Sequence, residues 1–182
     1  MDQSSSSTTS NPDLRQKTYL WFQTFILEKL VPLRNTGPIF RWIFKFPLLL
    51  DRLGLRFFIT KGILILATTG RRTGKQRCTP MEYGKVQPDG SYIVMSGWAG
   101  RTDWYLNALA EPHVTVKIGQ MVFKAIAMPL EDEEIAVLLN QVIQFNPASL
   151  RFFARWAGPF DSSPEGLAKA AHFFPSLKLK PF

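Results

Sequence analysis

Hydrophobic and polar positions follow three different patterns along the chain, and each pattern predicts a different kind of structure. Residues 14–61 are crowded with aromatic and aliphatic side chains, and we expect a helix over about 14–33. The sequence NTGP at 35–38 then interrupts regular structure, because glycine and proline both favour turns. A second helix is expected to begin near Pro38, which suits a first helical position, and to bend at Pro47.

The middle of the chain, residues 62–130, is typical of short β-strands. Gly62–Thr69 is a continuous apolar run, which predicts a strand buried on both faces. Asp103 is expected to cap one helix, Trp104–Ala110, that interrupts the series of strands. Short antiparallel strands with one intervening helix indicate a small closed or half-open barrel. The further strands are expected at Arg77–Lys85, Ser91–Ser96, His113–Ile118 and Met121–Pro129.

The last region, residues 131–182, returns to helical patterns. Glu131–Glu134 places acids where a helix dipole favours them, in a first turn. The helices expected here cover Ile135–Phe145 and about 148–157 and 164–174. Leu177–Pro181 alternates like an edge strand ended by proline. The three regions together predict an α+β fold with a single domain at 14–182, preceded by a polar tail at 1–13.

The net charge of +8 is concentrated in one part of the chain. Residues 14–77 hold 13 lysines and arginines and only two acids, Glu28 and Asp51. Such a surplus predicts an anionic partner, which would be a phosphorylated cofactor, an anionic membrane or nucleic acid. No nucleic-acid-binding motif accompanies the charge, so we do not expect nucleic acid.

The second predicted helix carries part of this charge as a stripe. If the helix continues past Pro47, then Arg41, Lys45, Arg52 and Arg56 fall within roughly 60° of one another around it. An apolar, aromatic helix with a basic stripe is typical of a segment that lies in a membrane interface. The alternative is a helix buried on most sides whose charges reach water. We recognise no export signal and no transmembrane segment, so we expect a cytoplasmic protein, at the inner face of the membrane if this helix binds it.

The densest chemical signal is the sequence TTGRRTGKQR at Thr68–Arg77. A predicted strand ends there, two glycines bracket a turn, and four cations fall within ten residues. Backbone amides and arginines in such a turn suit an anion, although neither GxxxxGK[ST] nor GxGxxG is present. The alternative is a solvated basic hairpin loop. We expect no metal site, because His113, His172 and Cys78 lie at no metal-ligand spacing, and we expect Cys78 to be a small core residue.

Four segments resemble the deazaflavin (F420)-dependent nitroreductase family. They are TTGRRTGKQRCTP at 68–80, SYIVMSGWAG at 91–100, DWYLN at 103–107 and EPHVTV at 111–116, in that order. The resemblance is strongest over about residues 38–130. It implies a split β-barrel of the FMN-binding type and coenzyme F420 as cofactor, whose tail carries a phosphate and a polyglutamate chain.

The resemblance also implies the residues that bind the cofactor. Its anionic tail would lie beside Arg71, Arg72, Thr73, Gly74 and Arg77. The strand that begins with Thr79 and Pro80 would run beneath the cofactor. The deazaflavin ring would lie at Ser96, Gly97 and Trp98, flanked by Trp104, for which a core position that anchors its helix is the alternative.

The family resemblance implies hydride transfer from reduced F420 to a flat, apolar acceptor, which would be a quinone, an enone or a nitro compound. The acceptor is expected to stack against aromatic residues such as Phe152, Phe153 or Trp156. Tyr83 and Ser96 are the candidate proton donors. Two departures separate the chain from well-studied relatives, which carry a lysine at position 97 and a tyrosine at position 82, here glycine and glutamate.

Two other interpretations of the sequence remain open at this point. One is an FMN or haem protein built on the same barrel. The other is a non-catalytic carrier of a lipid-like ligand, bound through the aromatic N-terminal region. The sequence is compatible with a monomer or a homodimer.

Overall fold

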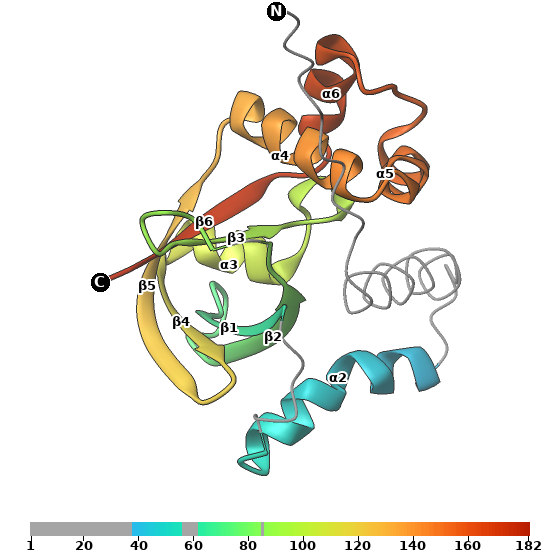
Figure 1. The fold of residues 1–182 in the computed structure, drawn as a ribbon. Coiled ribbons are helices and arrows are strands. Elements are labelled where there is room, and N and C mark those ends of the chain that lie inside the picture. The colour runs from blue at the N-terminus through green and yellow to red at the C-terminus, as the bar shows by residue number, and fades with distance from the viewer. Residues whose placement is uncertain (1–37, 56–61, 85) are drawn as a thin grey trace, which may run out of the picture. The chain divides into compact units, whose positions relative to one another are not determined.

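A six-stranded antiparallel sheet organises the part of the chain that the structure describes (Figure 1). This computed structural model describes residues 38–55, 62–84 and 86–182, so the predicted tail at 1–13 and helix at 14–33 lie outside the described residues. The strands follow the order β2-β1-β4-β5-β6-β3 across the sheet. They are β1 (Ile63–Thr69), β2 (Gln76–Glu82), β3 (Tyr92–Met95), β4 (His113–Ile118), β5 (Met121–Pro129) and β6 (Ser176–Pro181).

The sheet curls around one apolar core, and its two end strands meet through aromatic rings. Leu64, Leu66, Val116 and the other side chains of the inner face have almost no exposed surface. Tyr83, just after β2, contacts Tyr92 on β3 edge to face, with ring centroids 5.3 Å apart. Since β2 and β3 form no ladder with each other, this contact joins the two ends of the sheet by side chains. The result is a split β-barrel, which confirms the predicted α+β fold class.

The outer face of β1 is buried as well, and helix α2 (Pro38–Arg52) packs against the neighbouring strand β2. Side chains alternate along a strand, so Ile65 and Ala67 point away from the inner core, and both are buried. Lys117 on β4, the register partner of Ile65, forms a 2.7 Å ion pair with Asp51 of α2. The prediction that this strand is buried on both faces is therefore confirmed. Among the described helices, α2 included, none has the length and apolar character to cross a membrane.

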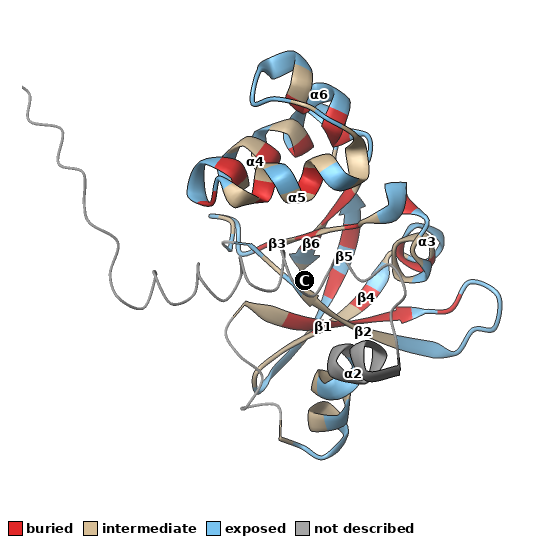
Figure 2. Ribbon diagram, turned by 90° about the vertical axis from the view of Figure 1, so that its right-hand side faces the viewer, coloured by how far each residue is buried: buried red, intermediate tan, exposed pale blue. Residues whose placement is uncertain are grey.

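Four further helices complete the described structure (Figure 2). Helix α3 (Asp103–Ala110) contacts β1 and β5, and its Ala108 is buried in the barrel core. Helices α4 (Asp132–Phe145), α5 (Ala148–Ala157) and α6 (Pro164–Ala171) gather around a second apolar core. Helix α4 begins with a capping box in which Glu131 and Glu134 satisfy each other's backbone amides, so the acids of this segment do mark a helix start.

The predicted edge strand at the C-terminus is a wrong assignment, because β6 pairs with β5 on one side and β3 on the other. Leu177 and Leu179 are buried, while Lys178 is partly exposed and Lys180 is exposed, which is the pattern of any antiparallel strand with one solvated face. Alternation therefore does not separate an edge strand from an interior one. Pro181 is tolerated because it lies beyond the end of the ladder with β3 and opposes only Ala125 of β5.

Three helix boundaries also differ from prediction. Helix α2 ends at Arg52, so Arg56 is not part of it and lies outside the described residues; the basic stripe is correspondingly shorter. The cap of α3 is Thr102 rather than Asp103, whose carboxylate is used in an ion pair with Arg71. Helix α6 ends at Ala171, three residues before the predicted end.

Candidate cofactor site

The basic segment between β1 and β2 is a tight, closed turn. The amides of Thr73 and Gly74 donate to the carbonyl of Gly70 at 3.0 and 2.7 Å, and the Gly70 amide donates to the carbonyl of Lys75 at 2.9 Å. A Cβ atom on Gly70 would lie 3.0 Å from that Lys75 oxygen, and Gly74 has a φ of +65°. Both glycines are therefore required by the backbone.

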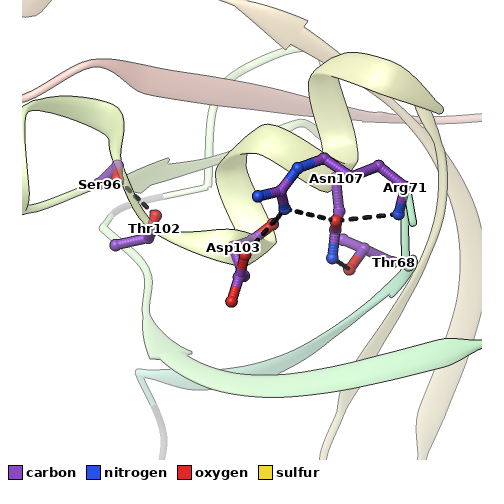
Figure 3. Close-up of polar contacts among 6 residues, drawn as sticks. All are labelled: Thr68, Arg71, Ser96, Thr102, Asp103 and Asn107. Carbon is purple, nitrogen blue, oxygen red and sulfur yellow. Dashed lines mark hydrogen bonds and ion pairs between the residues drawn. The ribbon is translucent and has the colours of Figure 1, made fainter. Parts of the chain in front are cut away.

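Arg71, the first cation of the turn, is used to fix the turn to helix α3 (Figure 3). Its Nη1 donates to Oδ1 of Asp103 at 2.8 Å and to Oδ1 of Asn107 at 2.9 Å, and its backbone amide donates to Asn107 at 3.1 Å. Only 24% of the Arg71 side chain is exposed. Asn107 is 3% exposed and reaches Thr68 on β1 with its amide nitrogen. Arg71 thus links the turn to the barrel, a role that the sequence did not reveal.

Asn107 is the site residue that sequence reasoning missed. It belongs to the DWYLN segment and follows Asp103 by four residues, which places both side chains on one face of α3. That spacing is the only signal that points toward a shared partner, and it does not identify Arg71 as the partner.

The other cations of the turn are exposed. Among the described residues, the side chains of Arg72, Lys75 and Arg77 form no hydrogen bond or ion pair. Arg77 is the second residue of β2, directly after the turn, and we call the segment 71–77 the basic turn. Its three uncompensated positive charges fit a ligand that carries several negative charges. Lys75 was not among the predicted binding residues, yet it is exposed and has no partner among the described residues, as is true of Arg72 and Arg77.

A second loop, between β3 and α3, carries the predicted ring-binding residues. Ser96 has no exposed surface, and its hydroxyl lies 2.8 Å from Oγ1 of Thr102 (Figure 3). The Ser96 amide donates to the carbonyl of Pro175 at 2.9 Å. Both ends of the loop are therefore tied, and the Ser96 hydroxyl is directed at Thr102 rather than at solvent.

Three consecutive residues of this loop adopt the left-handed backbone conformation, with φ of 54° at Trp98, 49° at Ala99 and 72° at Gly100. This conformation costs a residue with a side chain about 1–2 kcal/mol. Such strain persists only where the surroundings hold it, and it is frequent at ligand sites. Trp98 is 62% exposed, while Gly97 before it leaves open space where a side chain would be.

We expect Gly100→Ala to lower the free energy of unfolding by about 2–3 kcal/mol, because the residue would be strained at positive φ and also overpacked. A Cβ there would lie 2.9 Å from Cγ of Pro175 and 3.2 Å from Cε1 of Tyr105. Chemical denaturation measures the change. Gly97→Ala is the matched control, since nothing lies within 4 Å of its Cβ, and equal losses in the two variants would contradict the packing argument.

Trp98 forms one wall of a groove whose other wall belongs to the C-terminal helices. The rings of Trp98 and Trp156 meet edge to face, with centroids 4.8 Å apart and planes at 72°. The groove has a volume of about 240 Å³ and is lined by Trp98, Ala99, Arg101, Trp156 and Phe173. Of the aromatic residues expected near the acceptor, Trp156 lies there, whereas Phe153 is buried in the second core with Phe152 packed against it.

The remaining predicted residues lie on the barrel. Trp104 packs against the inner core and against Tyr105, which supports its alternative interpretation as an anchor of α3. Burial raises the pKa of Tyr105, and the charge of Asp132 adds to this effect, so its phenol stays neutral. Thr79 opposes Leu66 and Pro80 opposes Ile65, so these two neighbours point to opposite faces of β2.

Comparison with known proteins decides between the open interpretations. A family model described as F420H(2)-dependent quinone reductase matches residues 52–156, which is more than half of the chain. The chain belongs to this family. It is accordingly an F420-dependent reductase, an oxidoreductase whose cofactor is coenzyme F420, rather than an FMN or haem protein or a non-catalytic carrier.

Solved structures with similar folds include an F420-H2 dependent reductase, at 23% identity, covering 65% of this chain and 94% of that one, with a TM-score of 0.46. A second F420 reductase is 13% identical and covers 66% of this chain and 86% of its own, with a TM-score of 0.37. General stress protein 26 from Bacillus anthracis is 15% identical, with coverage of 69% and 83% and a TM-score of 0.43.

The described residues fit the cofactor. The three uncompensated cations of the turn suit a tail with phosphate and carboxylate groups, and the exposed Trp98 offers a flat surface to a ring system. No cluster of metal-ligating side chains is found in the described ranges.

Proposed function

We propose that this enzyme transfers a hydride from reduced F420 to the ring of a quinone. The observation that carries the proposal is the groove beside the left-handed loop, where Trp98, Trp156 and Phe173 provide flat apolar walls next to the expected position of the deazaflavin ring. Aromatic walls favour a flat conjugated acceptor by offset or edge-to-face stacking. A small acceptor held there would lie close to the cofactor, which lowers the entropic part of the barrier.

In this proposal the basic turn binds the tail. Arg72, Lys75 and Arg77 supply charge-assisted donors. Between Arg72 and Lys75, the Thr73 hydroxyl is a further donor, and Gly74 has no side chain to keep the tail away from the backbone. Arg71 positions this turn through Asn107 rather than binding the tail with its Nη1 atom. The ring would lie against Gly97 and Trp98, above Thr79 and Pro80, which lie in the middle of β2 and not at its start as expected.

Reduced F420 supplies a hydride when it is bound. The quinone gains that hydride, which is one proton with two electrons, and becomes a hydroquinone monoanion, which takes one further proton to give the hydroquinone. Ser96 is given a positioning role, because its buried hydroxyl bonds Thr102. Tyr83, which has some exposed surface, is the proton donor that we retain from the two predicted, with water as the alternative source.

The experiment is turnover of F420H2 with menadione, a neutral naphthoquinone, compared with an enone and a nitroaromatic compound at equal concentration. We expect the quinone to give the largest kcat/KM. Binding of F420 without quinone-dependent oxidation would contradict the acceptor assignment and leave the cofactor assignment intact.

Helix α2 supports a second proposal, peripheral contact with an anionic membrane. Phe46 and Leu49 of α2 and Leu53, the residue directly after it, are exposed and recur at helical spacing. Lys45 precedes Phe46 in the sequence and Arg52 precedes Leu53. Such a helix lies with its apolar side in the interface while its cations meet anionic lipid, as at a cytoplasmic leaflet. A quinone dissolved in the lipid would then be close to the enzyme.

We expect Leu49→Glu with Leu53→Glu to reduce binding to vesicles of phosphatidylglycerol and phosphatidylcholine at least tenfold, because two apolar contacts are lost and two like charges are added. Flotation of vesicles measures the bound fraction. Val137→Glu, an exposed apolar position on α4, is the matched control and should bind normally. Binding that survives the double change would exclude α2 as the contact.

A further inference from the structure

The groove between Trp98 and the C-terminal helices has one charged residue among aromatic rings. Arg101 is the only ionisable side chain in the lining, alongside Trp98, Ala99, Trp156 and Phe173. It is exposed, and within the described part of the chain its side chain has no hydrogen-bond or ion-pair partner. Asp103, the acid nearest to Arg101 in the sequence, pairs instead with Arg71. The groove therefore carries an uncompensated positive charge.

The size of the groove limits what it can hold. Its volume of about 240 Å³ is smaller than the roughly 300–1,000 Å³ of sites for drug-sized ligands. It suits one or two fused rings rather than a long ligand as a whole. The walls are rings that stack on flat surfaces, and a guanidinium at their edge pairs with an oxyanion on such a ring.

The wall that carries Arg101 is held by hydrogen bonds within its own loop. The Arg101 amide donates to the carbonyl of Trp98 at 3.1 Å, which closes the left-handed turn over Ala99. The hydroxyl contact between Ser96 and Thr102 ties the chain on either side of the turn. A backbone fixed by these hydrogen bonds reduces the entropy lost when a ligand binds beside Arg101.

We propose that this groove selects planar aromatic ligands that carry a negative charge, with Arg101 as the counter-charge. The inference rests on the proposed function for the groove's role as acceptor site. A hydroquinone monoanion, which a quinone becomes on gaining a hydride, belongs to this ligand class. Arg101 therefore strengthens the binding of acceptors that are already anionic. It also stabilises the negative charge that develops on a neutral quinone as the quinone gains the hydride.

The test measures ligand binding without cofactor. Equilibrium dialysis compares 1,4-naphthoquinone-2-sulfonate with menadione, and quenching of tryptophan fluorescence provides a second readout. We expect the wild-type protein to bind the sulfonate about tenfold more tightly, the worth of one exposed charge-assisted pair. Arg101→Gln should remove this preference while retaining menadione binding, Arg101→Lys should keep part of it, and the preference should fall with salt. Arg155→Gln, which removes an exposed arginine outside the groove lining, should behave like wild type.

Equal affinity of wild type for the two probes would overturn the proposal, and so would a preference that survives Arg101→Gln. Far-ultraviolet circular dichroism and the melting temperature confirm that the variants are folded, which the exposure of Arg101 leads us to expect. Equal affinity of wild type for the two probes, together with normal quinone turnover, would refute only this inference. A preserved preference without F420-dependent turnover would refute the proposed function and leave the anion site standing.

Discussion

Replacing Arg72 and Arg77 together by glutamine should weaken binding of coenzyme F420 about 100- to 1,000-fold. Each arginine is exposed on the basic turn and has no partner among the described residues, so both are available to the anionic tail. A hydrogen bond between charged groups is worth about 1.5–3 kcal/mol, and the exposure of both arginines to water keeps each loss near about 1.5–2 kcal/mol, so that two losses give this range. Fluorescence titration with oxidised F420 measures the dissociation constant. Because neither side chain supports the fold, we expect an unchanged melting temperature.

A control variant separates this effect from a general loss of positive charge. Arg151 and Arg155 are exposed on α5, away from the turn, and replacing both by glutamine removes the same net charge. This variant should bind F420 within about twofold of wild type, since exposed charges separated by more than a Debye length are screened at moderate salt. If both pairs weakened binding equally, long-range attraction rather than contact with the tail would be the cause.

The second large effect is expected at Asn107. Its Oδ1 accepts from the backbone amide and Nη1 of Arg71, and the residue is buried. Asn107→Ala removes the acceptor of the Arg71 amide and one of the two side-chain acceptors of Arg71 Nη1, which keeps Asp103, and this should lower the free energy of unfolding by about 2–3 kcal/mol. The turn that holds Arg72 and Arg77 would also lose its link to α3. We therefore expect F420 binding to weaken although Asn107 itself does not touch the tail.

Asn107→Asp is the informative companion variant. A carboxylate keeps the acceptor for both Arg71 donors and loses only the long contact to Thr68, at 3.5 Å. It should retain most of the stability and most of the affinity. Chemical denaturation and F420 titration on both variants test this, and an aspartate variant as damaged as the alanine variant would show that packing rather than these hydrogen bonds matters.

The strands were predictable because their signals are local. The glycine-bounded apolar run of β1 and the Gly119–Gln120 hairpin follow from neighbouring residues alone. The position of β6 between β5 and β3 was not predictable, because the alternation of Leu177 and Leu179 with lysines is the same for an edge and for an interior strand. Pairing order depends on contacts distant in sequence.

The site was predictable in composition but not in the use of each residue. The run of cations at 71–77 predicted an anion site, yet nothing in the sequence separates Arg71, which bonds Asp103 and Asn107, from its neighbour Arg72. Likewise the family resemblance implied a place for Ser96 at the ring, while the burial of Ser96 and its contact with Thr102 depend on Pro175 and α3. Residues whose hydrogen bonds join two elements of the fold can be recognised only when the position of the partner element is known.

The central claim is that the basic turn recognises the anionic tail of F420. The most direct measurement compares binding of F420 with binding of the same deazaflavin lacking its phosphate and glutamate tail, in wild type and in the Arg72→Gln, Arg77→Gln variant. The account predicts that wild type binds F420 at least 100-fold more tightly than the tailless compound and that the variant binds the two nearly equally. Equal affinities in wild type would contradict it, and so would a preference for F420 that persists in the variant.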